Sequence, residues 1–305
     1  KTGGFSMSEQ SLTREVLVAH PHTEATVVQR VFRKVRIGDL LSHLVLLLGA
    51  VTMVVPFLWM LSTSLKSDQQ AYIFPPIWIP QPIMWSNYIT TWQALPFDRF
   101  FINSLLVAVA VTFGQLLTCS MGAFAFARLH FPWREPLFVL YLATIMVPFQ
   151  VIMIPLFILV RELNWLDTYT GQIIPLIFSA YGTFLLRQFF RTIPIELEDA
   201  AKIDGCNYAR IFWNIMLPLS KPALATLGIF VFLFSWNNFL WPLLVINSLE
   251  MKTLPLGLAY FLGQYTIYWN LLMVGATITL LPVLIVFFFA QRYFIEGITL
   301  TGLKG

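Results

Sequence analysis

Acidic and alanine residues are concentrated in one short stretch of this 305-residue chain. The stretch contains three acids, two alanines and an Asp-Gly pair: Glu196, Glu198, Asp199, Ala200, Ala201, Asp204 and Gly205. Negative charges are favourable in the first turn of a helix, because the N-terminal end of a helix carries partial positive charge. Alanines keep such a helix thin, so that another protein can approach it closely. We therefore expect this stretch to dock in a groove of a partner protein rather than to catalyse a reaction.

The residues around this stretch predict two short helices separated by a turn. Thr192 is placed to cap the first helix, and Pro194 suits its opening turn. Gly205 can adopt the left-handed conformation that ends a helix, and Asn207 can cap the second helix. The apolar face of the second helix and its end are predicted at Ile211, Phe212, Ile215 and Pro218.

An amphipathic loop resting on the membrane surface is the alternative interpretation of this segment. Such a loop carries a basic polar face, because that face meets anionic headgroups. Glu196, Glu198 and Asp199 make the polar face acidic instead. The charge pattern therefore favours docking to a protein.

A second group of polar and aromatic residues lies in a long apolar stretch: Trp236, Asn237, Asn238 and Trp241. Amides can bond to sugar hydroxyls, and aromatic faces can cover the C–H surfaces of a sugar ring. Asn237 and Trp241 are four residues apart and are expected to share one helix face. The alternative is that these residues only hold packed helices together, as asparagines do within membranes. The residues favour neither interpretation.

Motifs for catalysis and nucleotide binding are absent from the sequence. The chain has no G-x-x-x-x-G-K-[ST] phosphate loop, no G-x-S-x-G turn and no H-E-x-x-H helix. Its His, Cys and carboxylate residues show no metal-ligand spacing. We expect no catalytic, cofactor or metal site, which disfavours a membrane-embedded enzyme. Any energy for transport must then come from a partner.

The composition is that of a multi-pass membrane protein, with 58% hydrophobic and 11% charged residues. Soluble domains have about 45–50% apolar and about 25% charged residues. Six charge-free stretches suit spanning helices, which need about 20 apolar residues: 40–64, 101–126, 136–160, 169–186, 223–247 and 270–290. The stretch 69–97 contains five prolines and is expected to be an ordered, aromatic-rich outer loop.

The predicted spans contain no Asp, Glu, Lys or Arg. Ion-coupled carriers usually keep an ionisable group or an unwound ion site at membrane depth, so a self-powered carrier or channel is disfavoured. Prolines within the spans are expected to kink them: Pro56, Pro148, Pro155, Pro175, Pro242 and Pro282.

The distribution of basic residues predicts that both termini are cytoplasmic. With that orientation, 15 of the 19 Lys and Arg residues lie on the cytoplasmic side, as the positive-inside rule requires. The remaining four lie outside: Lys66, Arg99, Arg161 and Lys252. The first helix is expected to act as an uncleaved membrane signal, and residues 1–6, which precede Met7, are expected to be an expression scar.

The spacing of residues 199–218 resembles the E-A-A-x3-G-x9-I-x-L-P loop of permease subunits of binding-protein-dependent ABC importers. The matching residues are Asp199-Ala200-Ala201, Gly205, Ile215 and Leu217-Pro218. Asp199 stands where the family usually has Glu, which keeps the charge. Residues 85–88 and 236–242 also resemble segments of carbohydrate-type permeases, and residues 297–305 are similar to the tail of the maltose-type second permease subunit.

The resemblance implies an all-α membrane protein with six transmembrane helices, both termini cytoplasmic, and the ABC importer permease fold. It implies a cytoplasmic tail over 1–37 and a transmembrane domain over 38–305. Within that domain lie a coupling loop at 190–222, with its helix near 195–205, and a C-terminal tail at 292–305. The tail residues expected to contact the ATPase are Thr299, Thr301, Lys304 and Gly305. A frayed terminus is the alternative for the tail.

The same resemblance implies the partners and the location. They are a second permease subunit that completes a heterodimer, two ATPase subunits that bind ATP and Mg, and an extracytoplasmic substrate-binding protein. The expected location is the lipid bilayer of the bacterial inner membrane, with no nucleic-acid partner. The implied function is uptake of a sugar or sugar-like solute by the maltose/glycerol-phosphate class of importer. Import of a phosphorylated polyol such as glycerol 3-phosphate is the alternative.

Overall fold

The computed structural model describes residues 37–263 and 267–302. Within these ranges the regular structure is helical, with a single isolated β-bridge between Leu262 and Ile267. The chain divides into two compact units, residues 1–56 and 57–305. The predicted tail over 1–37 therefore lies almost entirely outside the described residues.

The described part of the first unit is the beginning of helix α1 (Ile37–Ser64). From Leu40 to Ser64 this helix is apolar enough to span a membrane, and none of the residues in its most apolar part is buried. The expected first span at 40–64 is confirmed as one helix that continues through Pro56.

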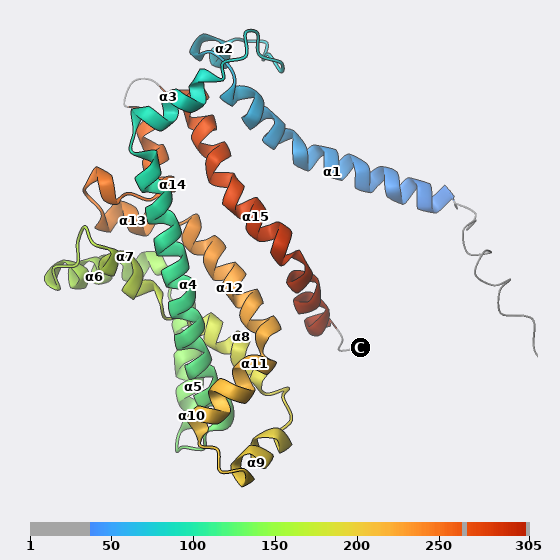
Figure 1. Cartoon of the computed structure of the whole chain (residues 1–305), viewed down its shortest axis with the longest axis vertical. Helices are drawn as coiled ribbons and strands as arrows, with labels where there is room; N and C mark the ends of the chain where they lie inside the picture. The colour runs from blue at the N-terminus through green and yellow to red at the C-terminus, as the bar shows by residue number, and fades with distance from the viewer. Residues whose placement is uncertain (1–36, 264–266, 303–305) are drawn as a thin grey trace, which may run out of the picture. The chain divides into compact units, whose positions relative to one another are not determined.

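The second unit is built on α4 (Phe97–Arg128), which lies alongside α8 (Ala180–Phe190) and α12 (Lys221–Trp236) (Figure 1). The last helix, α15 (Trp269–Gly302), packs on α12. The expected spans at 101–126 and 270–290 are confirmed as helices, and both are longer than expected. The buried side chains of α4 include small or polar ones, such as Ala108, Cys119 and Ser120, where the backbones of neighbouring helices can approach closely.

The expected outer loop is ordered and includes two short helices, α2 (Asp68–Tyr72) and α3 (Ser86–Ala94). The Asn87 side chain donates hydrogen bonds to the carbonyls of Ser64 and Lys66, at 2.8 and 2.7 Å. These bonds satisfy carbonyls at the end of α1 that have no partner within the helix. The loop is therefore held against the end of α1.

Two of the expected spans are broken rather than continuous. Helix α5 (Arg134–Ala143) with the short turn η2 (Thr144–Met146) meets α6 (Phe149–Glu162) at an angle of 97°. The break falls at Pro148, which lacks the N–H that would continue the helix. Helix α7 (Tyr169–Ile173) with η3 (Ile174–Leu176) is bent by 46° from α8.

The predicted end of the span at 223–247 is also wrong. Helix α12 stops at Trp236, and α13 (Leu240–Val245) begins after a break at Asn237–Phe239. The following segment is interrupted, as expected from its glycine and proline residues: η5 (Leu249–Met251), α14 (Leu254–Leu258) and η6 (Ala259–Phe261). In the described part of the chain, three helices can span a membrane by length and hydropathy, or up to six if each bent pair counts as one span.

Asp167 fastens the connection that follows α13 to the loop that precedes α7. Its Oδ1 accepts hydrogen bonds from Asn247 N, Ser248 N and Ser248 Oγ. Partial burial opposes ionisation of this carboxyl, but the hydrogen bonds from Ser248 and Asn247 outweigh it and hold the pKa of Asp167 below its usual value.

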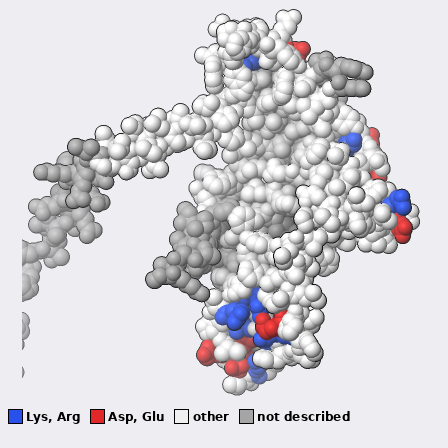
Figure 2. Space-filling view, turned by 180° about the vertical axis from the view of Figure 1, so that it is seen from behind, with Lys and Arg blue, Asp and Glu red and all other residues white. Residues whose placement is uncertain are grey.

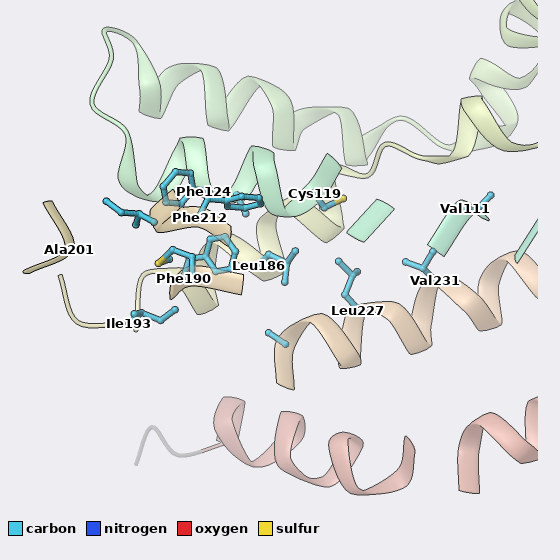
Figure 3. Close-up of a cluster of buried hydrophobic side chains, with 14 of the residues drawn as sticks. Val111, Cys119, Phe124, Leu186, Phe190, Ile193, Ala201, Phe212, Leu227 and Val231 are labelled. Carbon is cyan, nitrogen blue, oxygen red and sulfur yellow. The ribbon is translucent and has the colours of Figure 1, made fainter. Parts of the chain in front are cut away.

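A buried apolar cluster in the second unit joins α4, α8 and α12 to the segment 193–216, which includes the acidic helix. Figure 3 shows Phe124 of α4 beside Phe212 and Phe190, with Ile193 on the connection to the acidic helix and Ala201 within that helix. Burial of each such Phe or Leu side chain contributes roughly 1.5–3 kcal/mol to folding. The acidic helix is thereby held on the bundle.

Candidate functional site

The acidic stretch forms helix α9 (Glu196–Ile203), followed by α10 (Tyr208–Ile211). Gly205 has φ +80°, and the Asn207 side chain accepts a hydrogen bond from Arg210 N at 2.9 Å. Both expectations for the turn are confirmed. The expected cap at Thr192 is wrong, because its hydroxyl donates to the Phe189 carbonyl and Ile195 stands at the N-cap of α9.

The second helix continues beyond its expected end at Pro218. A π-helical turn, η4 (Phe212–Met216), follows α10 and leads into α11 (Leu217–Leu219). Pro218 stands in the first turn of α11, where no donor is needed from its nitrogen. The helix bends by 78° at Ser220 before α12 begins, and Ile215 is half-buried against the cluster.

The three acids of α9 take different positions. Glu198 is only 2% exposed, and its Oε1 forms an ion pair with Arg128 Nε at 2.8 Å. The N–H of Arg128 Nε does not point at this oxygen well enough to form a hydrogen bond. Glu196 is exposed, and Asp199 is exposed while its Oδ1 lies 3.0 Å from Lys202 Nζ. The hydrogen bond from Lys202 to Asp199 raises the pKa of the Lys202 ammonium. Two of the three acids are therefore available to a partner.

The outer surface of α9 combines these charges with apolar residues. Ile203 is 87% exposed, Ala200 is exposed, and no atom lies within 4 Å of a Cβ built on Gly205. In Figure 2, charged side chains gather at one end of the unit, while most of the remaining described surface on that face is uncharged. An exposed isoleucine beside two exposed acids is the composition of a docking surface rather than of a solvated loop.

Two buried arginines behind α9 were not predicted as part of the site. Arg128 Nη2 donates to the carbonyls of Phe190 and Ile193. Arg187 Nε donates to the Phe126 carbonyl, and its Nη2 lies 2.6 and 2.8 Å from the oxygens of Glu135. Their position could have indicated this role, because each arginine lies in the last turn of its helix, next to a connecting loop.

Of the residues expected on a substrate path, the two tryptophans are buried in contacts between helices. Trp236 donates from Nε1 to the Thr279 carbonyl at 3.1 Å and stacks on Phe232. Trp241 donates from Nε1 to the Gly171 carbonyl at 3.0 Å and is 0% exposed. These contacts are the ones that the packing interpretation expects.

The two asparagines lie in the break between α12 and α13. The expectation that Asn237 and Trp241 share one helix face is therefore wrong. Asn238 Oδ1 accepts a hydrogen bond from Trp241 N in the first turn of α13. Asn237 is exposed and borders a cavity of about 300 Å³ with Pro255, Thr279 and six further residues.

A second cavity, of about 400 Å³, lies at the break before α8. Its lining combines an amide, two hydroxyls and aromatic rings: Gln115, Ser179, Tyr181, Leu227, Phe230, Val231 and Phe234. These residue types suit sugar hydroxyls and C–H surfaces. The sequence did not reveal the group, because its members come from three separate helices.

Polar side chains of α4 support the break that borders this cavity. Gln115 Nε2 donates to the Leu176 carbonyl at 2.7 Å, Thr118 Oγ1 donates to the Ile177 carbonyl, and Cys119 Sγ lies 3.4 Å from the Ser179 carbonyl. Irregular backbone within a membrane is tolerated only where it is buried in protein or lines a cavity. Broken helices at membrane depth mark binding sites in transporters.

The predicted tail site remains a prediction. The backbone of Thr299 and Thr301 is part of α15, but the structure does not describe their side chains. Lys304 and Gly305 lie outside the described residues. Among the described residues, no group of His, Cys, Asp and Glu has the arrangement of a metal site.

Comparison with known proteins matches residues 114–299 to the family described as binding-protein-dependent transport system inner membrane component. The chain is 36% identical over 269 residues to the sn-glycerol-3-phosphate transport system permease protein UgpE of Yersinia pestis, covering 85% of this chain and 95% of that protein. It is 42% identical over 245 residues to the arabinooligosaccharides transport system permease protein AraQ of Halalkalibacterium halodurans, covering 80% and 86%.

A solved structure shows the same fold. It is that of a bacterial ABC transporter involved in the import of the acidic polysaccharide alginate, and one of its chains superimposes with a TM-score of 0.77. The two chains are 24% identical, and the match covers 86% of this chain and 98% of the other.

Proposed function

The chain belongs to the inner membrane component family of binding-protein-dependent transport systems, and on that premise we propose that it forms half of the path for a sugar or sugar-like solute. It is a permease subunit of an ABC importer, embedded in the membrane by several apolar helices. The observation that carries the proposal is the exposed surface of α9, where Glu196, Asp199 and Ile203 are accessible to another protein.

Membership of this family implies a second permease, an ATPase and a binding protein. In the proposed assembly the second permease completes a heterodimer, and two ATPase subunits bind ATP and Mg and perform the hydrolysis. The chain itself supplies no catalytic group. It crosses the inner membrane six times, with each bent helix pair counted as one span, and both termini are cytoplasmic. The excess of Lys and Arg on the cytoplasmic side supports this orientation.

The proposed mechanism starts at α9. ATP binding closes the ATPase pair and moves α9, and the broken spans exchange an inward-facing for an outward-facing arrangement. The tail residues Thr299, Thr301, Lys304 and Gly305 are proposed as a second contact with the ATPase.

Ile203→Asp is expected to release the ATPase subunits from the purified complex. A charged group at the centre of a buried contact is disfavoured, and a loss of roughly 1.4 kcal/mol already weakens binding tenfold. The amount of ATPase that co-purifies with the tagged chain measures the effect. The matched control is Ile79→Asp, at a 72% exposed isoleucine of the outer loop. Equal retention of the ATPase by both variants would argue against docking at α9.

We place the substrate path at the cavity beside the α8 break rather than at Trp236 and Trp241. Tyr181 is 52% exposed at that cavity, so its ring is available to a solute, whereas both tryptophans are not. Asn237 stays a candidate because it borders the other cavity, of about 300 Å³. The described residues that line the cavity at Tyr181 include no Lys or Arg, which supports a neutral sugar over glycerol 3-phosphate.

Tyr181→Ala is expected to lower uptake about tenfold or more while the ATPase stays bound, because a central aromatic contact often carries over 2 kcal/mol of binding. Uptake of labelled arabino-oligosaccharide and of labelled glycerol 3-phosphate is compared in cells that express the whole importer. Tyr268→Ala, at a half-exposed tyrosine away from this cavity, is the control. Uptake of glycerol 3-phosphate alone would favour the alternative substrate, and transport by the isolated chain in liposomes would favour a self-powered carrier.

A further inference from the structure

We infer that the buried Arg128–Glu198 ion pair transmits the movement of α9 to α4, so that Arg128 and Glu198 are positioning residues for coupling. This inference rests on the proposed docking of the ATPase at α9. The pair joins the last residue of α4 to the middle of α9, and both side chains are at least nine-tenths buried.

Arg128 holds three elements together. Its Nε faces Glu198 of α9 at 2.8 Å, while its Nη2 donates to the carbonyls of Phe190 and Ile193, where α8 ends and the connection to α9 begins. A guanidinium presents several donors in a fixed planar arrangement, so it can hold both partners at once. The connection from α8 to α9 is thereby wrapped around the end of α4.

The ion pair determines where α9 lies on the bundle. Apolar packing of α9 relies on Ala201, whose single methyl group can slide over the cluster without a large change in contact. A charge cannot slide in this way, because displacement leaves a buried charge without its partner. Buried ionic and polar groups can fix the register of packed helices, which is the property that transmission requires.

The other acids of α9 cannot take this role. Glu196 is exposed, and the ion pair of Asp199 is made with Lys202 of the same helix. Glu196 is therefore a matched control for Glu198: it is the same residue type, two positions away, on the same helix.

A second ion pair connects the neighbouring elements but does not reach α9. Arg187 of α8 binds Glu135 at the start of α5 and the Phe126 carbonyl of α4. Movement that enters through Glu198 thus reaches α4 and, through the two arginines, also α8 and α5.

The test measures whether nucleotide changes the accessibility of a cysteine that borders the proposed substrate path. Phe234→Cys is introduced at the 63% exposed phenylalanine that borders the cavity, in a Cys206→Ser background in which Cys119 is buried. The assembled importer in liposomes is labelled with a membrane-impermeant maleimide, with and without ATP, Mg and vanadate. The labelling rate is compared in the parent and in three variants: Glu198→Gln, Glu198→Asp and Glu196→Gln.

The parent and Glu196→Gln are expected to show the same nucleotide-dependent change in rate. Glu198→Gln is expected to reduce that change about fivefold or more, within the range of coupling effects for residues that link two sites. Glu198→Asp, which keeps the charge with a shorter reach, is expected to be intermediate. In each case the ATPase subunits co-purify as in the parent, so a loss of the response reports transmission rather than lost docking.

A full response in Glu198→Gln would overturn the inference. If Glu198→Gln does not assemble, Glu198→Asp decides, because an unreduced response in that variant would overturn it equally. If the ATPase is lost with both variants, the pair maintains the docking surface and the inference is overturned. Absence of the ATPase from the parent complex contradicts the proposed function, independently of the ion pair.

Discussion

Replacement of Gly205 with aspartate is expected to abolish ATP-driven uptake while the subunit stays in the membrane. Gly205 has φ +80°, where most residues with a Cβ are strained by about 1–2 kcal/mol and aspartate, like asparagine, is better tolerated. The open space around its Cα excludes a steric clash as the cause. The effect is expected from the charge, because the new carboxylate would stand in the turn that joins α9 to α10, beside the docking surface.

The measurement is solute uptake together with the amount of this chain in the membrane fraction. Gly205→Asn is the matched variant, because asparagine tolerates the left-handed conformation and adds no charge. It is expected to retain most of the uptake. Normal uptake in Gly205→Asp would contradict the role of α9 as the coupling element.

Trp241→Ala is expected to destabilise the subunit by about 3–5 kcal/mol, the usual range for loss of a buried large aromatic side chain. Trp241 is 0% exposed and bonds to the Gly171 carbonyl, so its loss leaves a cavity and an unpaired carbonyl between α13 and α7. The yield and the thermal unfolding temperature of the detergent-solubilised protein measure the effect.

Two further tryptophan variants separate the contributions. Trp241→Phe keeps most of the apolar area and loses the hydrogen bond, so it is expected to cost about 1 kcal/mol. Trp213→Ala, at a 56% exposed tryptophan, is expected to be near neutral. A stable Trp241→Ala subunit that has lost uptake would instead favour a place for Trp241 on the substrate path.

Local signals in the sequence predicted the turn chemistry around α9 well. Gly205 and Asn207 act within three residues of their own position, so their roles follow from residue type alone. Thr192 was misjudged because a threonine hydroxyl can also bond to a carbonyl within the preceding helix, and that choice depends on where the helix ends.

Long-range contacts were harder to predict. Glu198 looks like its neighbours Glu196 and Asp199 in the sequence, and only the position of Arg128, 70 residues earlier in the chain, makes it an internal group. The lengths of the charge-free stretches predicted where the apolar segments lie. They did not predict where these segments break, because apolar residues lie on both sides of the breaks at Pro148 and at Asn237. The cavity at Tyr181 needed three helices to be placed before it could be recognised.

The bonds from Gln115 and Thr118 to the carbonyls at the α8 break limit how the protein can open. Rotation of α4 against α8 would expose these carbonyls to hydrocarbon, where an unsatisfied polar group costs several kcal/mol. We therefore expect α4 and α8 to move together rather than independently. A passage for a solute would then open along a seam that lies outside this pair of helices.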